Sequence, residues 1–278
     1  MIYWYWLLGV SLLFVLLERL RPARRSQGTL RPQLVNDLFY LAFHGHWYAL
    51  LTGAWTGAIA LRTREALAPY LPFAESGAAL GRLPWVAQFA VYLVVSDFLQ
   101  WCVHNLLHRV PLLWQFHKLH HSVRRMDWAA NFRFHWMEVV VYRSLLYLPL
   151  ALLGGEGSAL FAVAVFSTFW GHLNHANLDF GLGPASYVLN GPRMHLWHHD
   201  ASDEGGVAKN FGIVLSLWDW LFGTAYWPRD RAPARIGYPS DEEMPRDLPR
   251  QLLFPLTRVR GAASGSSGGS CRSYPRRR

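Results

Sequence analysis

Long apolar runs, each followed by arginine, constrain this chain more than any other feature of its sequence. The first run covers Ile2–Leu17, a second Leu38–Leu61 and a third Leu83–His108. A helix needs about 20 apolar residues to cross the hydrocarbon core of a bilayer, so the runs predict membrane-spanning helices. The arginines follow the first run instead of preceding it, which argues against a secretory signal. The alternative, buried helices of a soluble protein, is disfavoured by the tyrosines and tryptophans at positions 3–6, which resemble an interfacial aromatic belt.

The third run is long enough to reach beyond the hydrocarbon. Its 26 residues make about 39 Å of helix at 1.5 Å per residue, so the last two turns should project into the headgroups or the cytoplasm. A later apolar stretch breaks at Gly154–Gly157 into two arms, 139–153 and 158–170. Each arm is short for a full span, and we predict a helical hairpin that enters and leaves on one side. A short interfacial helix is expected at Arg64–Leu71.

The arginines predict the orientation and the parts of the chain. Counting the predicted spans puts four segments on the same side of the membrane: 19–31, 109–138, 171–230 and the Gly/Ser-rich tail 261–278. Most of the arginines lie in these segments, which marks that side as cytoplasmic. We predict an all-α fold of multi-span membrane helices with a helical, histidine-bearing metal domain on the cytosolic face. The expected parts are N-terminal spans and a loop in 1–82, a catalytic domain in 83–230, and a C-terminal segment with a disordered basic tail in 231–278.

Composition excludes several protein classes. Apolar residues make up 52% of the chain and charged residues 16%, which excludes an intrinsically disordered protein. The only two cysteines, Cys102 and Cys271, lie in unlike contexts and are expected to be free thiols. A net charge of +9 would suit nucleic acid, but the apolar residues gather in span-length runs, so the predicted partner is a membrane. Only two of the 27 basic residues are lysines, a bias that indicates a GC-rich bacterial genome and hence a bacterial inner membrane.

Ten of the 13 histidines fall into four clusters of helical spacing. The clusters are His104 and His108; His117, His120 and His121; His172 and His175; and His195, His198 and His199. Residues three and four apart share one face of a helix, so each cluster presents its imidazoles together. Neutral imidazole is the commonest metal ligand among side chains. Two metal ions with about five nitrogen ligands each would satisfy all ten rings. Of the other three histidines, His44 and His46 are interpreted as hydrogen-bonded histidines within a helix bundle.

The residues leave the metal and the class of protein open. Cysteine ligands are absent, which excludes zinc-finger and Fe–S sites. Glu-x-x-His motifs are absent too, which excludes a carboxylate di-iron site. An all-nitrogen site accepts iron, zinc or copper. A non-redox membrane metal-binding or transport protein is one alternative, although transporter ligands lie near the bilayer midplane. A zinc hydrolase is another, although such enzymes need a nearby glutamate base.

The histidine series resembles the fatty acid hydroxylase/sterol desaturase superfamily over about residues 85–230. Further matches are Arg133 to Glu138, where Trp136 replaces the usual proline of an R-x-H-P-x-E segment, and the H-x-N element that begins at His175. The segment Asn210-Phe211-Gly212 and the later Trp218 to Thr224 resemble the closing N-F-G and W-D-x-x-F-G-T signatures of that family.

This resemblance implies a non-haem di-iron oxygenase. The ten clustered histidines would hold two iron ions, O₂ would be the co-substrate, and no catalytic residue is expected beyond the metal ligands. The reaction would hydroxylate or desaturate an unactivated C–H position of a lipid that enters from the bilayer, with sterol-like, fatty acyl and ether lipids all compatible. No His-Pro-Gly-Gly motif of a fused cytochrome b5 is present. Electrons should therefore come from a separate donor of the cytochrome b5, ferredoxin or reductase type.

Carboxylates and one further histidine are candidates for orienting the ligand rings, because a metal-bound imidazole donates its other N–H to a carboxylate or carbonyl. Asp97 lies seven residues before His104, on the same helix face. The other candidates are His135, Glu138, Asp200 and Asp219. We expect His135 to hydrogen-bond Glu138, three residues on, and not to bind metal.

Overall fold

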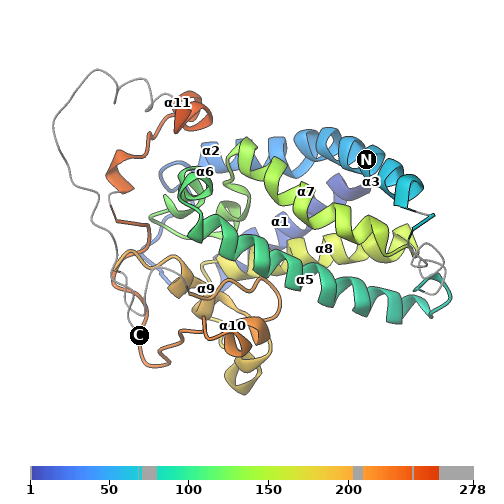
Figure 1. Cartoon of the computed structure of the whole chain (residues 1–278). Helices are drawn as coiled ribbons and strands as arrows, with labels where there is room; N and C mark the ends of the chain where they lie inside the picture. The colour runs from blue at the N-terminus through green and yellow to red at the C-terminus, as the bar shows by residue number, and fades with distance from the viewer. Residues whose placement is uncertain (1, 68, 71–79, 203–208, 240, 257–278) are drawn as a thin grey trace, which may run out of the picture.

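The computed structural model describes residues 2–67, 69–70, 80–202, 209–239 and 241–256 (Figure 1). Over these residues the regular structure is entirely helical, which confirms the predicted all-α class. Cys102 is a free thiol, as expected. The predicted tail 261–278 and Cys271 lie outside the described residues. The proposed interfacial helix at Arg64–Leu71 lies partly outside them, and its first residues belong to the end of α3 (Tyr48–Leu67).

Two of the described helices are long and apolar enough to cross a membrane, α1 (Ile2–Leu20) and α5 (Trp85–Arg109). The second apolar run is interrupted instead of forming one regular helix. It consists of α2 (Leu34–Ala42), a π-helical turn at Phe43–Trp47, and α3. Crossing of the membrane by this run stays a prediction.

The two arms of the predicted hairpin are α7 (Trp136–Leu152) and α8 (Gly157–His175), which pack more closely against α5 than against each other. The chain reverses through Gly154 and Gly155, whose φ angles of 64° and 129° favour glycine. The two helices pack with α5 through a cluster of buried apolar side chains: Tyr92, Leu146, Leu150, Ala159 and Val163. The position of this hairpin relative to the bilayer stays a prediction.

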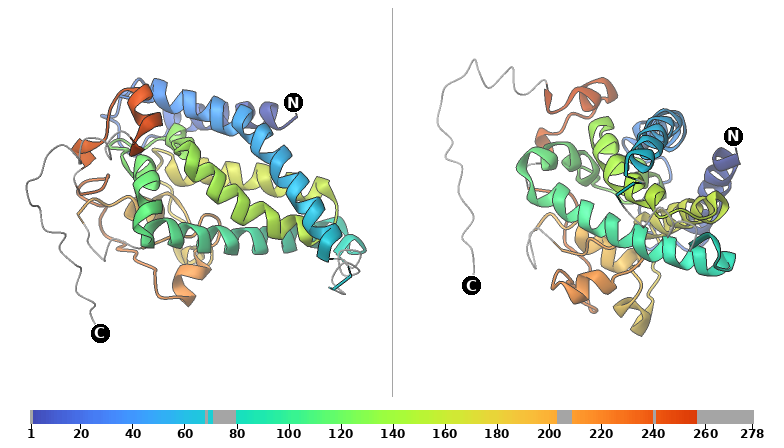
Figure 2. Two further views of the ribbon diagram at one scale, coloured as in Figure 1. Left: turned by 45° about the horizontal axis from the view of Figure 1, so that its top comes forward. Right: turned by 45° about the vertical axis from the view of Figure 1, so that its right-hand side comes forward.

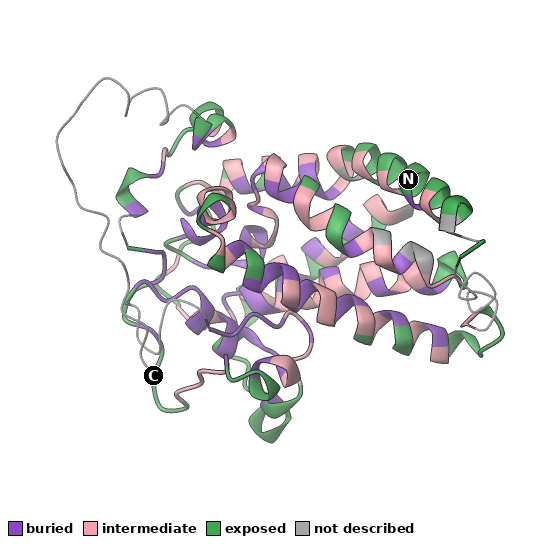
Figure 3. Cartoon of the chain, viewed as in Figure 1, coloured by how far each residue is buried: buried purple, intermediate pink, exposed green. Residues whose placement is uncertain are grey.

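The shorter helices gather around the C-terminal end of α5 (Figures 1 and 2). They are α6 (Pro111–His121), α9 (Pro192–His198), α10 (Leu217–Leu221), α11 (Leu248–Leu253) and three 3₁₀ turns at Trp128–Phe132, Gly183–Tyr187 and Asp241–Glu243. Figure 3 shows that buried residues concentrate in this part of the molecule, whereas the far ends of α3 and α5 are largely exposed. The chain therefore has an apolar helical half and a densely packed half, and the latter carries the histidine clusters.

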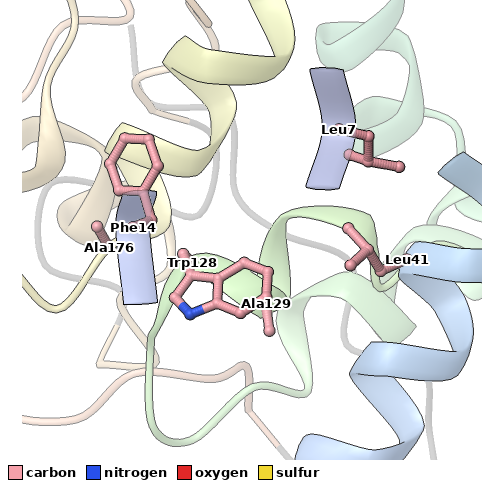
Figure 4. Close-up of a cluster of buried hydrophobic side chains, with 6 residues drawn as sticks. All are labelled: Leu7, Phe14, Leu41, Trp128, Ala129 and Ala176. Carbon is pink, nitrogen blue, oxygen red and sulfur yellow. The ribbon is translucent and has the colours of Figure 1, made fainter. Parts of the chain in front are cut away.

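The N-terminal helix is packed against the histidine-bearing half. Figure 4 shows the buried cluster that joins α1 and α2 to the Trp128 turn and the end of α8; its members are Leu7, Phe14, Leu41, Trp128, Ala129 and Ala176. A buried ion-pair network adds to this contact. Arg31 pairs with Asp37 and Asp127, and Arg133 pairs with Asp37. The predicted division at residues 82 and 230 stays a prediction.

Candidate metal centre

Nine of the ten clustered histidines come together in two adjoining groups. The five-histidine group consists of His104, His108, His117, His121 and His198. The four-histidine group consists of His120, His175, His195 and His199. Within each group, one ring nitrogen of every member lies within 4.8 Å of the others. The rings of His121 and His199, one from each group, stack with their centroids 4.4 Å apart.

Helical spacing explains how each H-x-x-H-H cluster serves both groups. On α6, His117 and His121 are four residues apart and point to the five-histidine group, whereas His120 points to the other. At α9 the pattern is reversed. His195 and His199 join the four-histidine group and His198 the five-histidine group. The last turns of α5 and α8 supply the other three members.

Burial keeps these imidazoles neutral. Burial, followed by the neighbouring histidines, lowers the pKa of His117, His120 and His121 well below the usual value. The same two causes lower the pKa of His195, His198 and His199. A neutral imidazole has one nitrogen with a free lone pair, which is the form that binds a metal ion.

Many of the ring nitrogens lack a hydrogen-bond partner among the described residues. These include Nε2 of His104, His117 and His198, Nδ1 of His108, His120 and His195, and both nitrogens of His199. In the four-histidine group, Nε2 of His175 lies 3.2 Å from Nε2 of both His120 and His195. Buried polar atoms without partners are costly, and nitrogens that converge on common points suit metal ions. The donor set therefore fits two metal ions.

Hydrogen bonds to the opposite ring nitrogen fix several of these rings. The Nδ1–H of His117 donates to Glu138 Oε1 over 2.8 Å, and that of His104 donates to the Phe211 carbonyl over 2.9 Å. His198 and His175 donate to the carbonyls of Lys209 and Gly171, both over 2.8 Å. This is the common arrangement around metal-bound histidines, because it directs Nε2 to the metal and makes it more basic.

The loop that holds His104 has specific residue requirements. Asn210 adopts a left-handed φ of 53°, which asparagine tolerates well. A Cβ on Gly212 would lie 2.3 Å from the Leu215 carbonyl oxygen, so this position requires glycine. The Asp219 carboxylate accepts hydrogen bonds from the backbone N–H groups of Phe211 and Gly212. Asp219 therefore acts on His104 indirectly, through the Phe211 peptide.

Two other carboxylates predicted to orient the ligands form hydrogen bonds to other residues. Asp97 accepts hydrogen bonds from the N–H groups of Val214 and Leu215 and from the Trp218 indole, and among the described residues it has no hydrogen bond to either histidine group. Asp200 accepts a hydrogen bond from the Lys209 ammonium at 2.9 Å, and the carbonyl of the same lysine holds His198. Burial opposes ionisation of Asp200, but hydrogen bonds from Ser202 and Lys209 lower its pKa overall.

The expected hydrogen bond between the side chains of His135 and Glu138 is not formed. His135 caps the N-terminus of α7, where its Nδ1 accepts from the Met137 N–H and its Nε2–H donates to the Leu252 carbonyl at 3.0 Å. The Glu138 carboxylate instead accepts the hydrogen bond from His117. His135 lies outside both histidine groups.

The structure does not bring His172 into either group. Its Nδ1–H donates to the Thr168 carbonyl at 3.0 Å, and its Nε2 accepts from Ser11 Oγ of α1 at 3.2 Å. The ring also stacks on Trp128. His44 and His46 lie in the π-helical turn, where they pack against Tyr40 and Trp4, and neither joins a group.

The sequence did not reveal the carbonyl acceptors of Phe211, Lys209 and Gly171. A backbone carbonyl has no residue signature of its own. The signals that could have indicated them are Lys209, one of two lysines in the chain, and the Asn210-Phe211-Gly212 segment.

Comparison with known proteins identifies the family. The fatty acid hydroxylase family model matches residues 89–224. Ornithine lipid hydroxylase OlsE from Rhizobium tropici is 30% identical over 256 residues, which is 90% of this chain and 74% of that protein. Human alkylglycerol monooxygenase is 27% identical over 64% of this chain and 40% of its own length. Fatty acid hydroxylase vlmA from Lecanicillium sp. is 29% identical over 57% of this chain and 48% of its own. No solved structure gives a significant match.

The family model covers the helices and loops that supply all nine grouped histidines. The similarity to the bacterial hydroxylase extends beyond this region to most of both chains. The chain belongs to the fatty acid hydroxylase/sterol desaturase superfamily.

Proposed function

We propose that this protein is an integral-membrane lipid hydroxylase that uses O₂ at a centre of two iron ions. The observation that carries the proposal is the pair of buried all-histidine groups, five and four rings, with nitrogens that converge and lack other partners. The relatives, named as lipid hydroxylases and monooxygenases, support an oxidoreductase that acts on a membrane lipid.

Each histidine group would hold one iron ion. Iron bound there would supply the activation of O₂, so that R–H, O₂, two electrons and two protons give R–OH and water. The chain contributes neutral ligands, which add no negative charge to the ions. Glu138 and the three carbonyls orient four of the rings. Among the described residues, eight of the nine grouped histidines are buried, which excludes water from around the reacting oxygen.

The substrate we propose is a membrane lipid with a polar headgroup. Ornithine lipid and alkylglycerol appear in the names of two relatives, and both kinds of molecule combine apolar chains with a polar end. The histidine groups lie at the C-terminal end of α5, where a membrane helix of 25 residues reaches past a hydrocarbon core of about 30 Å. A lipid can thus approach from the bilayer. We propose hydroxylation over desaturation because these relatives are named hydroxylases and monooxygenases.

The reaction consumes two electrons per turnover. We propose a separate donor of the cytochrome b5, ferredoxin or reductase type. We also propose a multi-pass protein of a bacterial inner membrane, with the histidine groups and the C-terminus in the cytoplasm. A reporter fused after Arg278 should then be cytoplasmic and one inserted near Gly77 external; both on one side would contradict an even number of spans.

The decisive experiment combines metal analysis with isotope labelling. The purified chain, reconstituted in vesicles with total lipids of its host and loaded anaerobically with Fe(II), should contain two iron ions per chain. With an added reductant it should transfer one atom of ¹⁸O₂ to a lipid detected by mass spectrometry. His195→Ala should abolish the transfer, whereas His46→Ala, a histidine outside both groups, should retain it. Metal binding without O₂ consumption would favour the alternative, a non-redox metal-binding or transport protein.

A further inference from the structure

Two segments outside the membrane helices carry almost no charge. Residues 180–192 contain no charged residue, and residues 213–228 contain one, Asp219, which is fully buried. We call these two segments together the apolar lobe. They contain the 3₁₀ turn Gly183–Tyr187 and α10, which lie together beside α5 in Figure 1. Loops on a water-exposed surface are normally polar, so the composition of the lobe needs an explanation.

Large apolar side chains of the lobe point outward. Their exposed fractions range from 36% for Trp220 to 64% for Leu221. The other members of this surface are Phe180, Tyr187, Val188 and Phe222. The rings of Tyr187 and Trp220, one from each segment, lie with their centroids 4.9 Å apart. Exposed apolar surface shared by two segments in this way marks an interaction with a protein or a membrane.

The contacts of α10 place the lobe at a defined height along α5. The ring of Phe98 lies 4.9 Å from that of Trp218, and the ring of Trp101 lies 4.7 Å from that of Phe222. Phe98 and Trp101 follow Trp85, the first residue of α5, by 13 and 16 residues, which is about 20 and 24 Å of helix. A hydrocarbon core of about 30 Å that begins near Trp85 would end about 6–10 Å beyond these rings, which is the depth to which interfacial apolar faces are buried. The lobe therefore lies near the membrane boundary on the side of the histidine groups.

The lobe also continues the lipid-facing side of α5. Val94 and Val91 lie one and two turns before Phe98 and on the same face of the helix. Both are exposed, at 45% and 36%, as side chains that contact lipid would be. The lobe thus covers the end of the α5 face that carries Val91 and Val94. The exposed apolar side chains of the lobe continue the apolar surface of that face.

An arginine follows each of the two segments of the lobe in the sequence. The Arg229 guanidinium lies 5.6 Å from the centre of the Tyr187 ring and 4.7 Å from that of Trp227, and it donates to the Tyr187 hydroxyl at 2.6 Å. Arg193 follows the uncharged segment 180–192 directly. Apolar side chains beside tyrosine, tryptophan and arginine are typical of the membrane–water interface.

We propose that the apolar lobe lies in the boundary between lipid headgroups and acyl chains, in the leaflet on the side of the histidine groups. Its partner is the lipid surface itself. This inference rests on α5 crossing the membrane and is independent of the proposed reaction. Asp219 belongs to the lobe and holds the Phe211 peptide that contacts His104. A lobe anchored in lipid would therefore fix the height of the five-histidine group above the bilayer.

Fluorescence quenching in vesicles tests the proposal without measuring activity. The full chain is prepared with Cys102→Ser and Cys271→Ser, and an environment-sensitive fluorophore is attached at Leu221→Cys or at Val188→Cys. Val94→Cys serves as the lipid-facing control and Glu242→Cys, an exposed charged position, as the water-facing control. The quenchers are a lipid with a nitroxide near its headgroup and aqueous iodide. Elution as a single species in detergent shows that each variant has folded.

Both lobe positions should be quenched several-fold more by the nitroxide lipid than the Glu242 position, and several-fold less by iodide. Quenching like that at Glu242 would overturn the proposal, because the lobe would then lie in water. Protection from both quenchers at Leu221 and Val188 would also overturn it, since the surface would then be covered by a second copy of the chain. The two positions lie on different segments, so a local disturbance at one leaves the other informative.

Discussion

The two histidine groups differ in how firmly their rings are held. In the five-histidine group, three rings have Nδ1 fixed by a hydrogen bond to a carboxylate or a carbonyl. In the four-histidine group, only His175 has such a bond, and the Nδ1 atoms of His120 and His195 have no partner among the described residues. We therefore expect the five-histidine group to be organised before a metal ion binds and the four-histidine group to gain part of its order from the metal.

The difference in ligand number points in the same direction. Around an octahedral metal ion, five nitrogen ligands leave one coordination position open, whereas four leave two. We expect the five-histidine group to bind its ion more tightly and the four-histidine group to release its ion first. Substitutions that alter one histidine group and leave the other intact test this expectation.

Removal of one ligand from each group should have the largest effect. His104→Ala leaves four histidines in its group, and His195→Ala leaves three in the other. Both variants should lose hydroxylation, and the metal content should fall from two ions per chain to about one in His195→Ala and by less in His104→Ala. Metal analysis of the purified variants measures this directly. Loss of both ions from either variant would show that the groups form one site and would break the comparison.

Asp219→Asn should have the next largest effect. The carboxylate accepts hydrogen bonds from Trp101 Nε1, Thr224 Oγ1 and the N–H groups of Phe211 and Gly212. An asparagine would turn an NH₂ group toward donors, at a cost of roughly 3 kcal/mol. Thermal unfolding should show this loss, together with weaker metal binding in the five-histidine group. The exposed Asp230→Asn is the matched control, expected within about 0.5 kcal/mol of the parent; equal loss in both variants would contradict the role of Asp219.

Glu138→Ala should weaken the five-histidine group alone. The His117 ring would lose the acceptor that orients it, and the loss of such a contact typically costs about 10–100-fold in metal affinity. Glu138→Gln retains an acceptor oxygen and should fall between the parent and the alanine variant. Chelator competition that resolves the two ions would measure both affinities. An equal loss in the four-histidine group would show that Glu138 supports the fold and not one ring.

The histidine pattern was predictable from sequence because it depends on spacing within single helices. His117 and His121, or His195 and His199, share a face in any helix that contains them. The interruption of the second apolar run was harder to predict, since Leu38–Leu61 reads as one apolar run while the chain forms a π-helical turn at Phe43–Trp47. The sequence also could not predict which histidine joins which group, because this depends on how α6 and α9 face each other.

Contacts between distant segments were the least predictable. Glu138 was expected to meet His135, its neighbour in sequence, yet its partner is His117, 21 residues away. His172 has the spacing of a ligand but contacts Ser11, which lies 161 residues earlier in the chain. Local spacing sets which face a side chain occupies, and the packing of α1 against α8 determines what that face meets.

His172→Ala gives the smallest expected effect and the sharpest test of the four-ligand count. The sequence alone predicts loss of metal, whereas the structure places the ring between Thr168 and Ser11. We expect both ions to remain and the stability to fall by about 1–2 kcal/mol, because Ser11 loses a buried partner. His175→Ala, one turn away, is the control that should lose metal. If His172→Ala also releases an ion, the four-histidine group has a fifth ligand in solution, and the two groups differ only in how their rings are oriented.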